Sequence, residues 1–453
     1  MVSQVKTTEV TWKTLSPDEK LERRLGAWLS ATGVKFATPE AEETYKSRVR
    51  NMIDVVRLKR TPDRIPVLPS FGGFAAAYYG YTERELMYDV DKAIEVATKS
   101  TLEFQIDAKI GANIQSGRVW DILDFRLYSW PGHGVDEKAG RQFNEGEYMK
   151  ADEYDVLMRD PSDYYWRTYL PRIMGALEPL HTVSYLPLRE GSSTGAPTML
   201  GAYGRPEVEV ALQKLVEAGK ETLRWQQKMT PANKRLTELG FPDVASSTSS
   251  APFDKIGNTL RGTREIIRDM YRQPEKLLEA LEWVTPQMVE SGVAGARLGA
   301  CPIVSMPIHR GADGFMSDEQ FRKFYWPTLR KVILGLIEEG LVPRLFAEGG
   351  YNSRLEVIRD LPRGKTIWHF DYTDMTRAKE LLGDVACIQG NVSVALIHTG
   401  TPEQTVAYCR KLIDTAGKGG GFIFSTGAGI DRGGKVENIR AMIKCAKEYG
   451  VYR

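Results

Sequence analysis

The chain has 453 residues, of which 42% are hydrophobic, and its 61 basic and 59 acidic residues leave a net charge of only +2. This is the composition of a globular protein with one large domain or two to three smaller ones. A charge so near zero lacks the basic surface that nucleic-acid binding needs, so no nucleic-acid partner is expected. The amino-terminus has no apolar signal segment and no stretch of 18 apolar residues occurs, which predicts no export and no membrane partner.

The four cysteines, Cys301, Cys387, Cys409 and Cys445, show no CxxC spacing. Unpaired cysteines in a chain of this size are typical of reduced thiols, so we predict a cytoplasmic protein. The last three lie in apolar runs, and we interpret them as small core residues rather than nucleophiles.

The predicted elements begin with helices over residues 1–60, an amino-terminal extension that precedes one large domain at 61–453. Ser16 before Pro17 is a typical helix start. The apolar run Ile65–Phe71 predicts a buried strand. Residues 83–103 then show helical periodicity, and Phe104–Ala108 predicts a second strand.

The middle of the chain is less regular. Residues 115–165 are rich in aromatic and turn residues and predict an excursion from the main fold. Residues 188–205 and 240–256 are rich in Ser, Gly and Pro, and we interpret both as long functional loops or lids.

From about residue 300, strand-like and helix-like runs alternate. Such alternation demands a parallel sheet. Together with the earlier units the count comes to about eight, which favours a (β/α)8 TIM barrel over an open doubly wound sheet. The five predicted strands are Ile303–Pro307, Arg344–Glu348, Thr366–Asp371, Val385–Gln389 and Phe422–Ser425.

Polar residues follow the predicted strands at their carboxyl ends, where the active sites of such barrels lie. Different strands that place polar groups at one rim indicate a functional site more than packing. In chain order these residues are Ser70, Asp107, His309 with Arg310, Glu348, His369 with Asp371, Asn391, and Thr426 to Arg432.

Each of these residues has a functional and a structural interpretation. Glu348 at the end of an apolar strand suits a general acid, a general base or a metal ligand, or else an acid that stabilises a helix start. His369 and Asp371 alternate on one strand and share a face, as an acid–base or metal pair would, or as a supporting hydrogen bond would. His309 and Arg310 suit an anion-binding loop or a solvated surface loop.

Glycines surround the last predicted strand. The segment from Thr426 and Gly427 to Arg432 could cradle a phosphate, although Arg432 stands at the third glycine position of GxGxxG. The same glycines would let a bulky planar ligand approach the backbone closely.

Several short motifs stand in the carboxyl-terminal units: Cys387–Val392 (CIQGNV), Gly400–Glu403 (GTPE), Gly421–Ile430 (GFIFSTGAGI) and Glu437–Ile439 (ENI). With them, and with Phe104–Ala108, Trp130–Gly132 and Asp152–Asp155, the chain resembles the uroporphyrinogen decarboxylase superfamily, which includes the decarboxylase and corrinoid-dependent methyltransferases. The resemblance covers 300–453 densely and 60–180 more sparsely, and it implies the TIM barrel.

Departures from the family pattern favour the methyltransferase-like branch. The decarboxylase carries an arginine-bearing segment after its first strand and a histidine in its last glycine motif, where this chain has Pro69–Gly73 and Ala428. The thiol-directed methyltransferases hold zinc on a His-x-Cys and a further Cys, where this chain has Phe346–Glu348 and again Ala428. The zinc-thiolate site is therefore absent as the family builds it, and whether Glu348 and His369 hold a metal stays open.

The resemblance implies a component that moves a methyl group from a small donor to a corrinoid (cobalamin) on a separate protein. Its leaving group needs a proton or electrostatic stabilisation, for which Glu348, His309 and His369 are the right types, with Asp371 and Asp107 as further catalytic candidates. Aromatic residues suit a methoxylated aromatic donor or, equally, core packing. The residues expected to bind substrate or cofactor are Phe71, Tyr78, Trp120, Trp130, Arg310, Asn391, Thr426, Gly427 and Arg432.

Two other functions remain open at this point. A decarboxylase or lyase of a smaller carboxylate would use Arg310, Arg432 and Asp107. A non-catalytic binding protein on the same barrel would tolerate Glu348→Gln and His369→Ala. The oligomeric state, including a homo-oligomer, is also left open.

Overall fold

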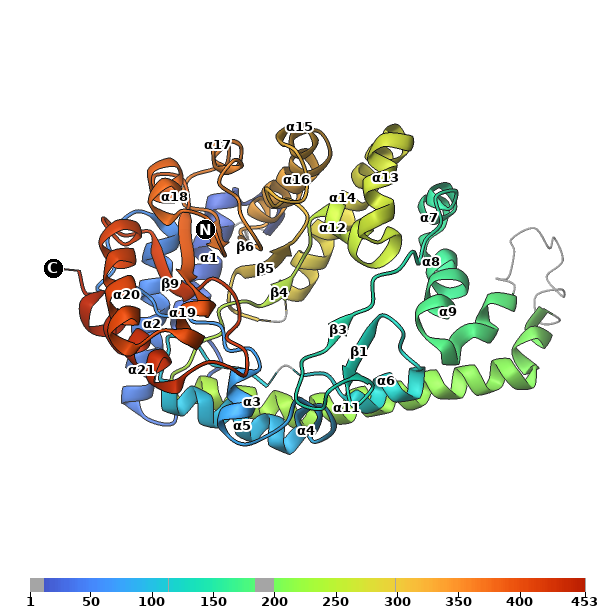
Figure 1. Ribbon diagram of the computed structural model, residues 1–453, viewed down its shortest axis with the longest axis horizontal. Coiled ribbons are helices and arrows are strands. Elements are labelled where there is room, and N and C mark those ends of the chain that lie inside the picture. Colours follow the sequence, from blue (N-terminus) through green and yellow to red (C-terminus); the bar gives the residue numbers. More distant parts are fainter. Residues whose placement is uncertain (1–11, 113, 184–198, 298, 453) are drawn as a thin grey trace, which may run out of the picture.

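The computed structural model describes residues 12–112, 114–183, 199–297 and 299–452. Its central element is a six-stranded parallel sheet in the order β4–β5–β6–β7–β8–β9 (Figure 1). Because spatial order follows chain order, helical crossovers join neighbouring strands, and the predicted α/β class with a parallel sheet is confirmed. The strands are β4 (Ser247–Thr248), β5 (Ile303–Ile308), β6 (Val342–Ala347), β7 (Ile367–Phe370), β8 (Cys387–Val392) and β9 (Phe422–Thr426).

Two extended segments continue the sheet beyond β9, at the places predicted for the first two strands. They are tied in by isolated backbone contacts and do not form regular strands, so closure of an eight-stranded barrel stays a prediction. The contacts run from Leu68 N–H to the Phe424 carbonyl (2.8 Å), from Asp107 N–H to the Val67 carbonyl (3.1 Å) and from Lys109 N–H to the Pro242 carbonyl (3.2 Å).

Helices cover one face of the sheet, as the alternating pattern predicts (Figure 1). Sequence explains their bounds: α20 begins after Thr401, whose hydroxyl caps the Gln404 N–H, and buries Cys409 and Leu412. None of the helices in the described ranges is long and apolar enough to cross a membrane. The covering helices are α14 (Pro274–Ala296), α16 (Trp326–Glu338), α17 (Leu355–Ile358), α18 (Met375–Leu382), α19 (Val394–Thr399), α20 (Pro402–Ala416) and α21 (Val436–Tyr449).

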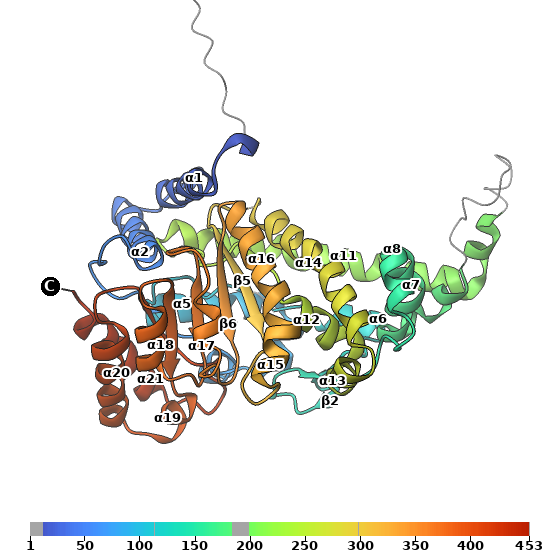
Figure 2. The ribbon, with the colours of Figure 1, turned by 90° about the horizontal axis from the view of Figure 1, so that it is seen from above.

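The opposite face, called the inner face below, is covered at the amino-terminal ends of the strands by α1 (Pro17–Ser30) and α2 (Pro39–Arg57) (Figure 2). The apolar cluster there joins strand residues to these helices. The predicted helices within 1–60 are thus present, and the domain boundary at 60 stays a prediction. The cluster includes Ile303, Val342, Ile367, Cys387 and Ile423 from the strands, and Trp28, Tyr45, Val49 and Met52 from α1 and α2.

The excursion predicted at 115–165 lies to one side of the sheet (Figure 1). The long helix α11 (Pro206–Glu238), which we did not predict, packs along α5 and α6. The elements of this half are α3 (Phe74–Tyr78), α4 (Glu83–Tyr88), α5 (Val90–Phe104), α6 (Gly117–Leu123), β1 (Tyr128–Pro131), β2 (Gly134–Val135), β3 (Gln142–Phe143), α7 (Tyr154–Arg159), α8 (Pro161–Tyr164) and α9 (Leu170–Ile173).

Neither predicted loop is a plain loop. The Ser-rich stretch 240–256 contains β4 and the helix α12 (Pro252–Ile256), so that prediction was wrong for half of its length. Of the loop predicted at 188–205, residues 188–198 lie outside the described residues, and Met199–Gly204 forms a 3-10 helix.

Candidate functional site

Three polar residues that follow neighbouring strands lie together at the carboxyl end of the sheet. His309 comes directly after β5, Glu348 after β6 and Asp371 after β7. The Glu348 N–H donates to the Ile308 carbonyl (3.2 Å), and the Gly349 N–H donates to Asp371 Oδ2 (3.2 Å). The strand ends therefore gather these side chains as the sequence predicts.

His309 and Glu348 form a hydrogen-bonded acid–base pair through His309 Nδ1 and Glu348 Oε2. The bond to the carboxylate raises the pKa of His309, and the bond to His309 lowers the pKa of Glu348. Both shifts favour an imidazolium facing a carboxylate. His309 Nε2 makes no hydrogen bond to any described residue, so the outer nitrogen is left to face a ligand.

The loop that carries His309 is held by Asp254, which the sequence analysis missed. Asp254 is fully buried and accepts hydrogen bonds from the His309 N–H (2.9 Å), the Arg310 N–H (3.0 Å) and the Tyr325 hydroxyl (2.6 Å). A buried carboxylate with three donors fixes the backbone rigidly. The only sequence signal is an Asp in the first turn of α12, behind the Ser-rich stretch that we took for a loop.

Arg310 lies next to His309 but is turned into the protein. Its Nη2 donates to Thr263 Oγ1 (2.7 Å), and its Nη1 lies 3.9 Å from Asp254 Oδ1. The residue is buried. These contacts explain Arg310 as an internal brace of the loop, whereas we had predicted that it binds substrate.

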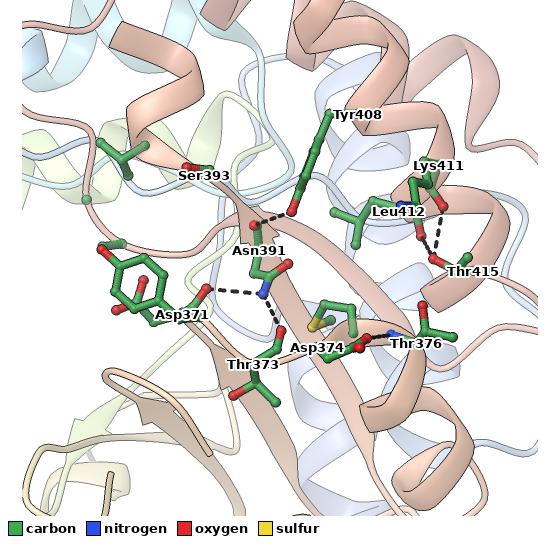
Figure 3. Close-up of a pocket in the computed structure, with 15 residues that line it drawn as sticks. Asp371, Thr373, Asp374, Thr376, Asn391, Ser393, Tyr408, Lys411, Leu412 and Thr415 are labelled. Carbon is green, nitrogen blue, oxygen red and sulfur yellow. Dashed lines mark hydrogen bonds between the residues drawn. The ribbon is translucent and has the colours of Figure 1, made fainter. Parts of the chain in front are cut away.

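Asp371 lies beside Glu348 and lines a cavity of about 570 Å³ between α18, α20 and the ends of β7 and β8 (Figure 3). Burial raises the pKa of Asp371, and the negative charge of Glu348 adds to this. Asn391 Nδ2 donates to the carbonyls of Asp371 (3.1 Å) and Thr373 (2.7 Å), so Asn391 holds the turn that carries Asp371. Gly427 is packed so closely that a Cβ would lie 2.8 Å from the Asp371 carbonyl oxygen.

His369 lies one strand position deeper than Asp371 and is buried. Its Nε2–H donates to the Thr426 carbonyl (2.8 Å), and burial together with the charge of Arg344 lowers its pKa to about 3. His369 is therefore a neutral imidazole at pH 7. Thr426 Oγ1 accepts from the Ser70 N–H (3.1 Å), so this strand end is braced rather than open.

The predicted metal pair of Glu348 and His369 is not brought together. Glu348 is bonded to His309, and His369 is bonded to the Thr426 carbonyl. Over the described ranges, no group of three or more His, Cys, Asp or Glu side chains is placed to hold a metal ion. This donor set does not fit a zinc site, which needs three or four converging ligands.

Asp107 lies away from these residues, although we had predicted it among the catalytic ones. It is buried in ion pairs with Arg64 (Nη1–Oδ2, 2.5 Å) and Arg48 (3.6 Å), and it accepts from the Val67 N–H (2.8 Å). The arginines come from α2 and from the segment just after it, far from Asp107 in the sequence. Its carboxylate is fully occupied in holding the second extended segment against the first.

Two of the predicted ligand-binding aromatic residues pack against other rings. Phe71 lies against Phe104 (ring centroids 5.0 Å apart), and Tyr78 stacks on Phe74 (5.4 Å) while its hydroxyl donates to Glu103 (2.7 Å). These contacts support the alternative that they are packing residues.

Trp120 and Trp130 belong to the excursion. They meet edge to face (5.4 Å), and Trp120 lines a cavity of about 550 Å³ between α6, β1 and α11. Arg432 Nη1 donates to the Lys138 carbonyl (3.1 Å), so it ties the loop after β9 to the excursion. The structure thus separates these three residues from the His309–Glu348 pair in their contacts.

Comparison with known proteins matches residues 245–449 to the family model of uroporphyrinogen decarboxylase (URO-D). This stretch is a URO-D-type domain. The predicted resemblance to that superfamily of enzymes is thereby confirmed. Among curated proteins, the uroporphyrinogen decarboxylase of Aromatoleum aromaticum is 26% identical over 190 residues (41% of this chain and 52% of that protein).

A methylated-thiol–coenzyme M methyltransferase of Methanosarcina mazei is 27% identical over 209 residues (45% of this chain and 53% of that protein). The chain thus spans about half the length of these curated relatives. A solved methyltransferase structure from Methanosarcina mazei superposes with a TM-score of 0.55 at 15% identity, covering 89% of this chain and 98% of that one. That likeness shows a shared fold.

Proposed function

We propose that the protein transfers a methyl group from a small, methoxylated aromatic donor to the corrinoid of a separate protein. The observation that carries this proposal is the His309–Glu348 pair at the carboxyl ends of β5 and β6, with the free Nε2 of His309. When a methyl group leaves an ether oxygen, the oxygen becomes a phenolate or alkoxide that must be protonated or stabilised. An imidazolium in this position supplies that proton.

Glu348 acts in this scheme as the positioning and charging partner of His309. Its carboxylate holds Nδ1 and raises the pKa of the ring, so that the proton on Nε2 is available at neutral pH. Asp371, whose pKa is raised, stands beside the pair as a second acid that can return a proton to His309 or Glu348. No step in this scheme passes through a metal ion.

The corrinoid belongs to the partner protein in this proposal. It supplies the nucleophile that accepts the methyl group, and this chain binds the donor and protonates the leaving oxygen. The family resemblance supports the partnership, and the printed names of relatives include both methyltransferases and decarboxylases.

A decarboxylase of a smaller carboxylate is the second candidate, favoured by the uroporphyrinogen decarboxylases among the relatives. Its predicted residues are otherwise engaged, because Arg310 is braced by Thr263 and Asp254, Arg432 bonds Lys138, and Asp107 is buried with Arg64 and Arg48. The geometry therefore gives this reaction less support.

The test is a reconstituted transfer assay with the purified protein, a corrinoid protein held in the reduced state, and a panel of methoxyarenes. We expect methyl-corrinoid to form, and His309→Gln to slow its formation by about 10²- to 10⁴-fold, the usual effect of losing a general acid. His181→Asn, at an exposed histidine bonded to the Glu178 carbonyl, is the matched control. Carbon dioxide release without any corrinoid would establish the decarboxylase instead.

A further inference from the structure

A guanidinium group lies deep on the inner face of the sheet, below the His309–Glu348 pair. Arg344, Phe346 and Glu348 alternate along β6 and its end and so share a face. Arg344 stands in register with Ile367, which in turn stands in register with Cys387. Because Ile367 and Cys387 pack toward α1 and α2, Arg344 belongs to the same inner face.

This guanidinium has no counter-charge among the described residues. Its Nε donates to Gln389 Oε1 (2.9 Å), and no carboxylate pairs with it in those ranges. The titratable groups that face it are Cys301, Cys387 and His369, and burial keeps all three neutral at pH 7. Burial lowers the pKa of Arg344 to about 10, so Arg344 itself stays charged. A buried charge without a partner is costly to a protein.

Donors beside Arg344 are also left without partners. The Nη1 and Nη2 atoms make no hydrogen bond to described residues, and the side chain keeps accessible surface. Gln389 is fully buried, and its Nε2 has no partner. Two neighbouring groups thus present N–H donors, one of them charged, to the same place. An anion with two or more oxygens satisfies such a set, and a guanidinium fork fits a carboxylate in particular.

A flat apolar wall lies between Arg344 and the strand ends. Phe346 is only partly buried, and its ring lies 4.9 Å from the ring of His369. Four residues separate Arg344 from Glu348, a Cα span of about 13 Å along a strand. An arginine side chain and one substituted aromatic ring together fill such a span.

We propose that Arg344 is an anion-binding residue and that the ligand of this site is an aromatic carboxylate, bound with its carboxylate on Arg344 and its ring against Phe346. This inference rests on the proposed function, for which it names the class of methyl donor. The substituent opposite the carboxylate then points to His309 Nε2, where the leaving oxygen is protonated.

The test is titration calorimetry of the full chain with benzoate and with benzamide, a neutral compound of the same shape. We expect benzoate to bind more tightly than benzamide, and Arg344→Gln to weaken benzoate binding by about tenfold or more while it leaves benzamide unchanged. Arg330→Gln is the matched control, because Arg330 pairs with Asp360 on the outside of α16. Equal binding of benzoate and benzamide, or of benzoate to wild type and Arg344→Gln, would overturn the proposal.

The comparison of the two ligands on the wild-type protein needs no variant, so a folding defect of Arg344→Gln does not remove the test. Gln389→Leu provides a second variant and should also weaken benzoate. Binding and methyl transfer fail separately. If neutral methoxyarenes are demethylated but benzoate does not bind through Arg344, only this inference is wrong. If benzoate binds through Arg344 but no donor is demethylated, the proposed function is wrong.

Discussion

His309 Nδ1 is hydrogen-bonded to Glu348 Oε2 across the carboxyl ends of two neighbouring strands, β5 and β6. The two residues are 39 positions apart in the sequence and meet only because the strands are parallel and in register. The pair joins a raised histidine pKa to a lowered carboxylate pKa, and the predictions on catalysis start from it.

Removing the carboxylate should move the pH profile of methyl transfer. In Glu348→Gln the pKa of His309 falls from its raised value back toward about 6.5. The imidazolium is then lost at lower pH, so the alkaline limb of the rate profile shifts to lower pH. Rates measured between pH 5 and 9 check this, and an unshifted limb would show that His309 is not the proton donor.

The same pair should contribute little to stability, and only in part of the pH range. The raised pKa of His309 gives stability that is full below about pH 6.5 and is lost as pH rises through the folded pKa, whereas the lowered pKa of Glu348 gives stability above about pH 4.5 that is lost on acidification. Glu348 is more than half exposed, so the contribution should stay below about 1 kcal/mol. Urea unfolding of wild type and Glu348→Gln at pH 6 and pH 9 measures the difference, which should shrink at pH 9.

Asp254 should be a stability determinant of the site. Asp254→Ala leaves the backbone N–H groups of His309 and Arg310 and the Tyr325 hydroxyl without their acceptor, and we expect a loss of about 3–5 kcal/mol in the free energy of unfolding. Tyr325→Phe removes one of the three bonds and should cost about 1 kcal/mol. Asp360→Asn, on the exposed outside of α16, serves as the control. Near-equal unfolding midpoints for Asp254→Ala and the control would contradict the role assigned to Asp254.

Gly427 should be intolerant of a side chain. A Cβ there would lie 2.8 Å from the carbonyl oxygen and 2.9 Å from Oδ1 of Asp371, so Gly427→Ala must displace the turn that carries Asp371. We expect about 1–3 kcal/mol of destabilisation. Gly314→Ala meets no atom within 4 Å and is the matched control. Thermal unfolding of both variants decides, and equal melting temperatures would show that the contact can relax.

Asp107 provides a test that separates structure from catalysis. Asp107→Asn leaves Arg64 and Arg48 facing a neutral amide and should destabilise the fold by about 3–5 kcal/mol. The methyl-transfer rate per folded molecule should be unchanged. A large fall in that rate with an intact fold would return Asp107 to the catalytic residues.

The sequence is enough to predict the parallel sheet and the gathering of His309, Glu348 and Asp371, because each follows a clear apolar run and parallel strands share one end. It is not enough to separate Asp107 from that group, since its neutralising arginines are 43 and 59 positions away. Asp254 was missed because β4 is two residues of Ser and Thr, which look like a loop. The helix α11 was missed because much of its apolar surface is exposed, including Val210, Val216 and Leu223.

The covering of the inner face by α1 and α2 at the amino-terminal strand ends has a kinetic consequence. A small ligand seated on Arg344 can arrive and depart only past His309 and Glu348. The partner that carries the corrinoid must approach the same opening, since its cobalt has to reach the transferred carbon. The donor therefore binds first and the demethylated product leaves last, so that product inhibition should be competitive with the donor and should strengthen as the partner saturates.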